Sequence, residues 1–210
     1  MPPALAEVEI IDKSTAYQGH YRVDRYRLRH TLFVGGWGRE ICREVLERGH
    51  AVAVLPYDPA RDAVVLIEQF RIGAYLHGGD SPWHGGGDSP WLLEIVAGLF
   101  DADEGPEEVA RREAAEEAGL ELGELVPVAA FYTSPGAVTE HVEVYCARVD
   151  SRGAGGIHGL AEEGEDIRVL VMPFAEAMAA LAAGRVRNSP ALVALQWLAL
   201  NREDLRARWG

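Results

Sequence analysis

The chain has 210 residues, 48% of them hydrophobic and 25% charged, which is the composition of a globular protein with room for one domain and a small extra sheet. Its 33 acidic residues outnumber 20 basic ones and give a net charge of −13, which argues against a nucleic-acid partner, because such a partner requires a basic surface. No apolar run is long enough for a membrane span, and the first residues, MPPALAEVEIID, lack the basic and apolar segments of a secretory signal.

Strand signals dominate the first half of the chain. The segment 21–33, YRVDRYRLRHTLF, has the alternation of a strand, and we expect Val23, Leu28 and Leu32 to point inward. The runs HAVAVLPY and AVVLIEQF flank DPARD, and this break, rich in proline and aspartate, predicts a hairpin. The run WLLEIVAGLF predicts one further buried strand.

A tandem repeat precedes that last strand. HGGDSPW at 77–83 is followed by HGGGDSPW at 84–91, which is too few copies for a repeat fold. The glycine, aspartate, serine and proline content predicts a surface loop that tolerates a duplication. Metal binding by His77 and His84 is the weaker alternative.

The segment GPEEVARREAAEEAG predicts a helix. Gly105 precedes Pro106 at the first helical position, Glu107 and Glu108 lie in the first turn, and Gly119 follows the last turn. These are helix start and stop signals in the expected order.

The second half of the chain alternates strands and helices. The Gly- and Glu-rich residues 150–165 predict a loop, and Ser189 is expected to cap the last helix, with Pro190 at its first position. The predicted strands are LVPVAAFYTS, VEVYCARV and DIRVLVMPF, and the predicted helices are AEAMAALAAG, ending at Gly184, and SPALVALQWLALNREDL.

One face of the first helix is crowded with acid. Residues three and four positions apart share a helix face, so Glu113, Glu116 and Glu117 point together and repel each other. A hard cation such as Mg²⁺, which prefers oxygen ligands, would reverse that cost. Small alanines at 110, 114 and 118 would let the helix pack closely on the preceding strand and loop. The alternative interpretation is a solvated acidic helix with one salt bridge.

A longer pattern favours the metal site. Gly98, Glu104, the pairs at 112–113 and 116–117, and Gly119-Leu120 fit G-x5-E-x7-R-E-U-x-E-E-x-G-U, with the small Ala114 at the first aliphatic position. This spacing resembles the Nudix box. The resemblance implies an α/β fold, a Nudix α/β/α sandwich with a mixed β-sheet, plus a small N-terminal antiparallel β-sheet. It also implies metal-dependent hydrolysis of a nucleoside diphosphate linked to another group.

The resemblance assigns roles within the box. It implies that Glu113, Glu116 and Glu117 are metal ligands, together with the carbonyl of Ala97. It implies that Arg112 and Glu104 orient these glutamates, so that Glu116, Arg112 and Glu104 belong to the catalytic set. The implied cofactor is about two or three Mg²⁺ per site, with Mn²⁺ as a substitute.

Residues outside the box point to a substrate. The proline of TSPGAVTE follows the box at the distance typical of the ADP-ribose pyrophosphatase branch, and CREVLERGHAVAVLPYDPARDAVVLIEQFRIGAY, PWLLEIVAG and GIHGLAEEGEDIRV are similar to that branch in the same order. The implied reaction gives AMP and ribose 5-phosphate from ADP-ribose. The alternatives are hydrolysis of other nucleoside diphosphate sugars and, less favoured, a non-enzymatic ADP-ribose-binding regulator. The substrate-binding candidates are Arg43, Glu44, Arg71, Pro135, Gly136 and Glu140.

The loop GLAEEGEDIR carries the remaining catalytic candidates. Its similarity to the same branch implies that Glu163 is the base that activates water and that Glu165 joins the metals. Tyr17, His20 and Tyr21 are three alternatives for stacking on adenine.

The resemblance also implies an oligomeric state. It implies a homodimer whose N-terminal β segment, 1–48, is exchanged between chains, while 49–210 forms the hydrolase domain. A segment too small to hold its own core is consistent with that exchange. Two distant cysteines, Cys42 and Cys146, are typical of reduced thiols in the cytoplasm.

Overall fold

The computed structural model describes residues 7–77, 89–100 and 103–210, and the chain falls into two compact units. The first unit comprises Met1–His50 and Tyr132–His141, and the second comprises Ala51–Phe131 and Val142–Gly210. Most of the tandem repeat, residues 78–88, lies outside the described residues. No helix within the described ranges is long and apolar enough to cross a membrane.

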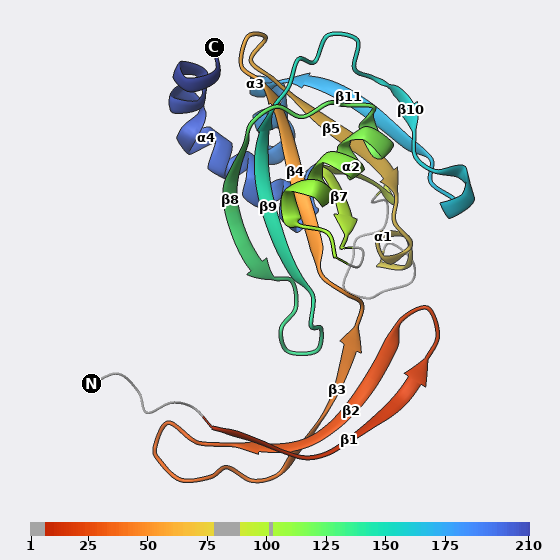
Figure 1. Cartoon of the computed structure of the whole chain (residues 1–210), viewed down its shortest axis with the longest axis vertical. Helices are drawn as coiled ribbons and strands as arrows, with labels where there is room; N and C mark the ends of the chain where they lie inside the picture. The colour runs from red at the N-terminus through yellow and green to blue at the C-terminus, as the bar shows by residue number, and fades with distance from the viewer. Residues whose placement is uncertain (1–6, 78–88, 101–102) are drawn as a thin grey trace. The chain divides into compact units, whose positions relative to one another are not determined.

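The first unit is a three-stranded antiparallel sheet in the order β1-β2-β3 (Figure 1). Its strands are β1 (Val8–Gln18), β2 (Arg22–His30) and β3 (Ile41–Glu47). Every residue of β1 is exposed. The expected small N-terminal antiparallel sheet is therefore confirmed.

The inward positions expected in this unit were partly wrong. Val23 and Leu28 are half-buried, but successive side chains alternate between the two faces of a strand, so two residues five positions apart face opposite ways. Leu32 lies beyond the strand and is exposed. The fully buried residue of β2 is Asp24, whose carboxylate accepts hydrogen bonds from Thr15 and Arg22.

The second unit is built on an eight-stranded mixed sheet. The apolar runs on either side of DPARD form the predicted hairpin, because Tyr57 pairs with Val64 across the turn. β4 and β9 run parallel, whereas the other registered pairs are antiparallel. Along the order β10-β11-β5-β4-β9-β8 the strands are Gly156–His158, Ile167–Pro173, Ala63–Phe70, Ala51–Asp58, His141–Arg148 and Leu125–Tyr132.

The single strand expected over WLLEIVAGLF is two strands. β6 (Trp91–Glu94) pairs with β5, and β7 (Val96–Leu99) pairs with β4. β4 and β5 pair directly only near their turn, at Tyr57–Val64 and Asp58–Ala63, and the chain changes partner at Ile95. β6 and β7 therefore supply the partners that β4 and β5 lack away from their turn.

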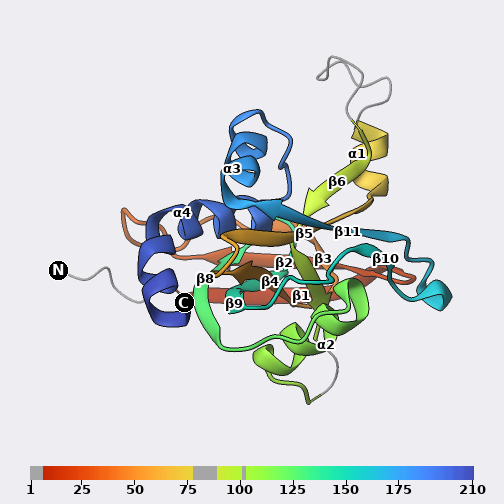
Figure 2. The ribbon, with the colours of Figure 1, turned by 90° about the horizontal axis from the view of Figure 1, so that it is seen from above.

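Helices cover both faces of this sheet, as expected for a sandwich (Figure 2). α3 (Phe174–Ala182) and α4 (Ser189–Trp209) lie on one face, and α2 (Pro106–Ala118) lies on the other. The short α1 (Ile72–His77) and the 3-10 turn η1 (Ala161–Glu163) were not predicted, and neither was β10, which lies within the expected 150–165 loop. The cap of α4 is Asn188, whose side chain accepts from the N–H of Ala191, and not Ser189.

The central position of β4 explains why residues 51–57 form an unbroken run without charge. All eight of its residues are buried. Ala53 and Leu55 join the cluster that packs against α4, whereas Val52 and Val54 join the cluster that packs against α2. A strand covered on both faces has no need of polar positions.

The β4–β5 turn is held by a buried carboxylate. Asp58 is 2% exposed. Its Oδ1 accepts from the N–H groups of Ala60 (3.0 Å) and Arg61 (3.1 Å), and its Oδ2 accepts from the N–H (2.9 Å) and hydroxyl (2.7 Å) of Ser151. Burial opposes ionisation, but the hydrogen bonds from Ser151, Arg61 and Ala60 outweigh it and lower the pKa of Asp58.

We expect Asp58→Asn to lower the free energy of unfolding by about 1–3 kcal/mol at pH 7, because the amide leaves a buried donor unpaired. A carboxylate with a depressed folded-state pKa stabilises above its unfolded pKa, near 3.8, and that stabilisation is lost as pH falls through the folded-state pKa. The difference between wild type and variant in urea unfolding should therefore shrink below pH 4. Asp150→Asn, at an exposed ion pair with Arg152, is the control and should cost less. A variant gap that is constant down to pH 2 would contradict this account.

Candidate active site

Helix α2 carries the acidic residues, and residues at each of its ends cap it. At its start the N–H of Gly105 donates to the carboxylate of Glu108 (2.8 Å), ahead of Pro106 at the first position. At its end Gly119 adopts a left-handed conformation, with φ 62°, and its N–H donates to the carbonyl of Ala115 (3.0 Å). The helix therefore begins and ends where the sequence predicted.

The helix lies very close to strand β7. Ala110, Ala114 and Ala118 are buried on its inner face. A Cβ atom built on Gly98 of β7 would lie 1.7 Å from Oε1 of Glu113. Only glycine at 98 therefore leaves room for the Glu113 carboxylate where it stands.

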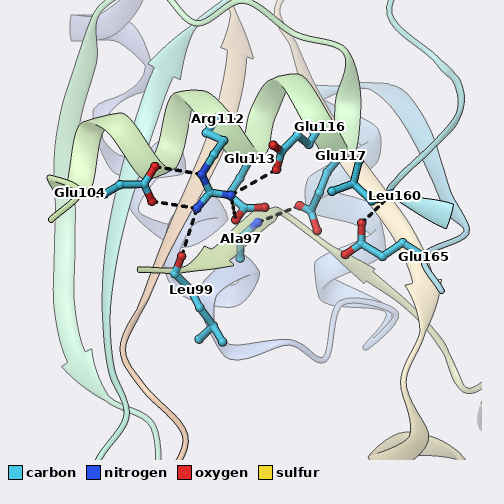
Figure 3. Close-up of polar contacts among 9 residues, drawn as sticks. All are labelled: Ala97, Leu99, Glu104, Arg112, Glu113, Glu116, Glu117, Leu160 and Glu165. Carbon is cyan, nitrogen blue, oxygen red and sulfur yellow. Dashed lines mark hydrogen bonds and ion pairs between the residues drawn. The ribbon is translucent and has the colours of Figure 1, made fainter. Parts of the chain in front are cut away.

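Arg112 is the centre of the polar network (Figure 3). Its guanidinium donates to both carboxylate oxygens of Glu104 at 3.0 Å, to Glu113 at 2.7 Å and to Glu116 at 3.2 Å. A further bond reaches the carbonyl of Leu99 on β7 (3.2 Å). The hydrogen bonds with Glu104 and then Glu113 raise the pKa of Arg112 against the effect of burial. The structure thus brings together four of the candidates from the box.

Glu117 is the most deeply buried carboxylate of the group. It is 2% exposed, and its Oε2 accepts a hydrogen bond from the N–H of Ala97 at 3.0 Å (Figure 3). Burial, followed by the charges of Glu113 and Glu165, raises its pKa to about 8, although the Ala97 bond and Arg71 oppose the shift. The contact of Ala97 seen here uses its N–H, so a role of its carbonyl as a metal ligand stays a prediction.

Arg71 brings positive charge near Glu117 and Glu165, and it is held by a residue that the sequence analysis missed. Glu94, at the end of β6, is 2% exposed and accepts from Arg71 through both oxygens, at 2.8–3.2 Å. Burial opposes the charge of Arg71, but the bonds to Glu94 and the charges of Glu117 and Glu165 raise its pKa. A lone glutamate inside the apolar run WLLEIV was the available signal, because a buried charge needs a partner.

The loop after β10 contributes Glu165. Its Oε2 accepts from the N–H of Leu160 (3.0 Å), so the carboxylate is tied back to the base of its own loop (Figure 3). Glu163 ends the turn η1, but its side chain lies outside what the structure describes. The catalytic assignment of Glu163 stays a prediction.

The other substrate candidates belong to the first unit. Arg43 and Glu44 are exposed on β3, where Arg43 donates to the carbonyl of Cys42 (2.8 Å) and Glu44 pairs with Arg25 (2.8 Å). Tyr21 contacts His20 edge-on, with ring centroids 4.6 Å apart, so the three candidates for adenine stacking stay open.

The segment TSPGAVTE forms a turn docked on the end of β3. The N–H of Leu46 donates to the carbonyl of Ala137 (2.8 Å). Pro135 and Gly136 lie exposed at the tip of the turn. Glu140 is buried and pairs with Arg48 (3.2 Å). Arg48 was missed by the sequence analysis, and its Nε is a buried atom without a hydrogen-bond partner among the described residues.

The donor chemistry around α2 fits a hard divalent cation. Within the described ranges, no three acidic, histidine or cysteine side chains converge closely enough to enclose a metal ion. Glu113 and Glu116 are instead bonded to Arg112, and Glu117 to Ala97. Oxygen ligands are nevertheless those that Mg²⁺ prefers. Burial, with the charges of Glu113 and Glu165, raises the pKa of Glu117, and a nearby cation would favour its ionised form.

Comparisons with known proteins show which family the chain resembles. The NUDIX domain family matches residues 47–195. The chain is 46% identical over 203 residues to the ADP-ribose pyrophosphatase of Escherichia coli K12, covering 97% of this chain and 93% of that protein. It is 41% identical over 205 residues to the ADP-ribose pyrophosphatase of Haemophilus influenzae, with 97% and 91% covered.

Two further relatives mark the range of the similarity. The GDP-mannose pyrophosphatase of Pectobacterium atrosepticum is 35% identical over 193 residues, with 90% of this chain and 92% of that protein covered. A solved structure described as an ADP compounds hydrolase superposes with a TM-score of 0.68 at 20% identity, covering 97% of this chain and 96% of that one. At that identity the likeness shows the fold alone, and it confirms the expected sandwich.

We expect Gly98→Ala to weaken the binding of Mn²⁺, used as a spectroscopic probe, by about 10-fold or more. The new methyl group overlaps the Glu113 carboxylate, and that flexible side chain can move away, so the thermal unfolding midpoint should change little. The measurement is Mn²⁺ titration followed by electron paramagnetic resonance. Gly73→Ala, at a glycine with nothing within 4 Å of the added Cβ, is the control. Unchanged Mn²⁺ affinity in Gly98→Ala would refute a role for the observed Glu113 position.

Proposed function

The chain belongs to the Nudix family, and on this premise we propose that it hydrolyses the diphosphate of ADP-ribose to AMP and ribose 5-phosphate with Mg²⁺ as its cofactor. In this reaction water adds across the P–O–P linkage. The bridging oxygen leaves with one phosphate, and the oxygen of water joins the other.

The observation that carries the reaction class is the burial of Glu117 beside Glu113 and Glu165. A buried group of carboxylates is unstable by itself, because like charges raise one another's pKa. It becomes useful where cations and a diphosphate complete the charge balance. The choice of ADP-ribose is supported by the two pyrophosphatases that match this chain over nearly its whole length.

Different residues of the site would bind the metal ions, orient the metal ligands and bind the phosphates. We propose that Glu113, Glu116, Glu117 and Glu165 hold the Mg²⁺ ions, about two or three of them, with Mn²⁺ able to substitute. Bound Mg²⁺ neutralises phosphoryl oxygens and lowers the pKa of a bound water. Arg112, fixed by both oxygens of Glu104, sets the direction of the Glu113 and Glu116 carboxylates. Arg71, fixed by Glu94, offers positive charge to the phosphates.

We propose Glu163 as the base that takes the proton of the attacking water. Its support is the match of the loop sequence GLAEEGEDIR, since the loop begins at Gly159, beside the end of α2. The adjacent Glu162 belongs to the same turn η1 and is the matched control. The kcat of Glu163→Gln should fall far more than that of Glu162→Gln, and equal losses would remove Glu163 from this role.

We further propose that the protein is a cytoplasmic homodimer in which residues 1–48 of each chain complete the partner's site. The free cysteines support the location. The exposed apolar side chains of β1, Val8 and Ile10 among them, support an exchanged sheet. In this arrangement Arg43, Glu44, Pro135, Gly136 and Glu140 bind the nucleotide.

Co-expression of two inactive variants tests the exchange. A dimer of one Arg43→Ala chain and one Glu117→Gln chain has both changes in one site and neither in the other. Activity recovered in the mixed dimer supports exchange, whereas its absence, with dimers shown by light scattering, argues that each chain completes its own site.

The second candidate is a hydrolase of other nucleoside diphosphate sugars. The 35% identity to a GDP-mannose pyrophosphatase is the observation that favours it. A regulator that binds ADP-ribose without turnover is less well supported, because all the glutamates of the box are present.

We expect Mg²⁺-dependent release of AMP from ADP-ribose, measured by chromatography, with slower turnover of ADP-glucose and GDP-mannose. Glu117→Gln should lower kcat by about 10²–10³-fold, because it removes a charge placed where the transition state needs it. Glu107→Gln, an equal change in charge in the exposed first turn of the same helix, should retain activity.

Three outcomes would redirect the assignment. Comparable rates on all three sugars would favour the broad hydrolase. ADP-ribose binding without turnover of any substrate would favour the regulator. Full activity in Glu117→Gln would contradict the role of the buried carboxylate.

A further inference from the structure

The C-terminal end of α2 is in direct contact with the chain that leads into the catalytic loop. Gly119 has a left-handed conformation, and a Cβ atom added to it would lie 2.7 Å from Cε1 of His158. The imidazole ring therefore rests against the bare Cα of the residue that ends the helix. This contact lies two residues beyond Glu117 on one side and precedes the loop carrying Glu163 and Glu165 on the other.

The ring of His158 is fixed by a hydrogen bond of its own. Its Nε2 lies 3.0 Å from the carbonyl oxygen of Gly155. Because a carbonyl only accepts, Nε2 carries the proton and donates. The next residue adds a second tie to the helix, since the N–H of Gly159 donates to the carbonyl of Glu116 (3.4 Å).

The loop that follows, residues 159–165, is held by hydrogen bonds between its own two ends. The N–H of Leu160 donates to the carboxylate of Glu165 (3.0 Å), and the N–H of Glu165 donates back to the carbonyl of Leu160 (3.2 Å). A Cβ atom on Gly159 would meet Cβ of Glu165 at 2.7 Å. Residues 159–165 therefore form one tight unit, and its attachment at His158 and Gly159 decides where Glu165 lies relative to α2.

We propose that His158 is a positioning residue that seats the 159–165 loop on the C-terminal end of α2. The contact requires both the imidazole ring of His158 and the absence of a side chain at Gly119. It sets the distance between the loop carboxylates and the glutamates of the helix. The inference rests on the proposed function for its catalytic consequence, but the contact itself can be tested without any activity.

A cycle of variants measures the contact by thermal unfolding. Gly119→Ala combines left-handed strain with overlap on the ring, whereas Gly184→Ala, at φ +70° with nothing within 4 Å, adds the strain alone. We expect Gly184→Ala to lower the unfolding midpoint by about 2–4 °C and Gly119→Ala to lower it by about that much again. In a His158→Ala background the Gly119→Ala effect should shrink to that of Gly184→Ala. Equal, additive effects in both backgrounds would overturn the contact.

The catalytic consequence has a separate readout. We expect His158→Ala to lower kcat for AMP release by about 10–100-fold with KM for ADP-ribose little changed, because it displaces catalytic carboxylates and no substrate contact. Hydrogen exchange of the amides at 159–165 should become faster. Unchanged kcat in His158→Ala, with the unfolding cycle coupled as expected, would overturn the positioning role. If wild type itself releases no AMP, the proposed function fails, and the unfolding cycle still decides the contact.

Discussion

The distance between α2 and β7 governs the chemistry of the site. Three alanines on the inner face of the helix and Gly98 on the strand allow the two elements to pack closely, with the side chain of Glu113 against Gly98. That approach removes Glu117 from water and places its carboxylate on the N–H of Ala97. With bulkier residues at these positions the helix would stand further out, and its glutamates would be hydrated surface charges. The opening between β4 and β5, filled by β7, provides the surface on which the helix rests.

Two arginines hold the acidic group together in different ways. Arg112 bonds to several carboxylates of the group at once, whereas Arg71 is exposed and is held by an ion pair with the buried Glu94. Arg112 is held by Glu104 and Arg71 by Glu94, so both guanidinium groups are already oriented before a ligand binds. Glu117 and Glu165 instead accept hydrogen bonds from backbone N–H groups, those of Ala97 and Leu160. A carboxylate held by a backbone N–H can change partners at small cost, which suits a ligand that binds and leaves.

The sequence alone predicted the elements that a local residue pattern determines. It missed the features that depend on contacts between residues distant in the sequence. The glycine, proline and glutamate signals located α2 and its ends, and the apolar runs located the β4–β5 hairpin. The change of partner at Ile95 is not marked by any turn residue in the sequence, because the chain passes directly from β6 to β7. Asparagine and serine are equally good N-cap residues, so the sequence could not tell whether Asn188 or Ser189 caps α4. Glu94 and His158 matter through contacts with residues far away in the sequence, which no spacing rule contains.

The parallel pairing of β4 with β9 ties the site to the folding of the whole second unit. Ala51 lies opposite Val142, and parallel strands cannot be joined by a tight turn, so the chain between them must leave the sheet and return. Helix α2 lies within that excursion. Such long-range closure folds slowly, because the entropy of a large loop is lost before the contacts that repay it have formed. β4 and β9 cannot pair unless the connection that contains α2 is also in place. We therefore infer that a mutation that weakens the sheet lowers the fraction of active molecules more than it lowers the kcat of each active molecule.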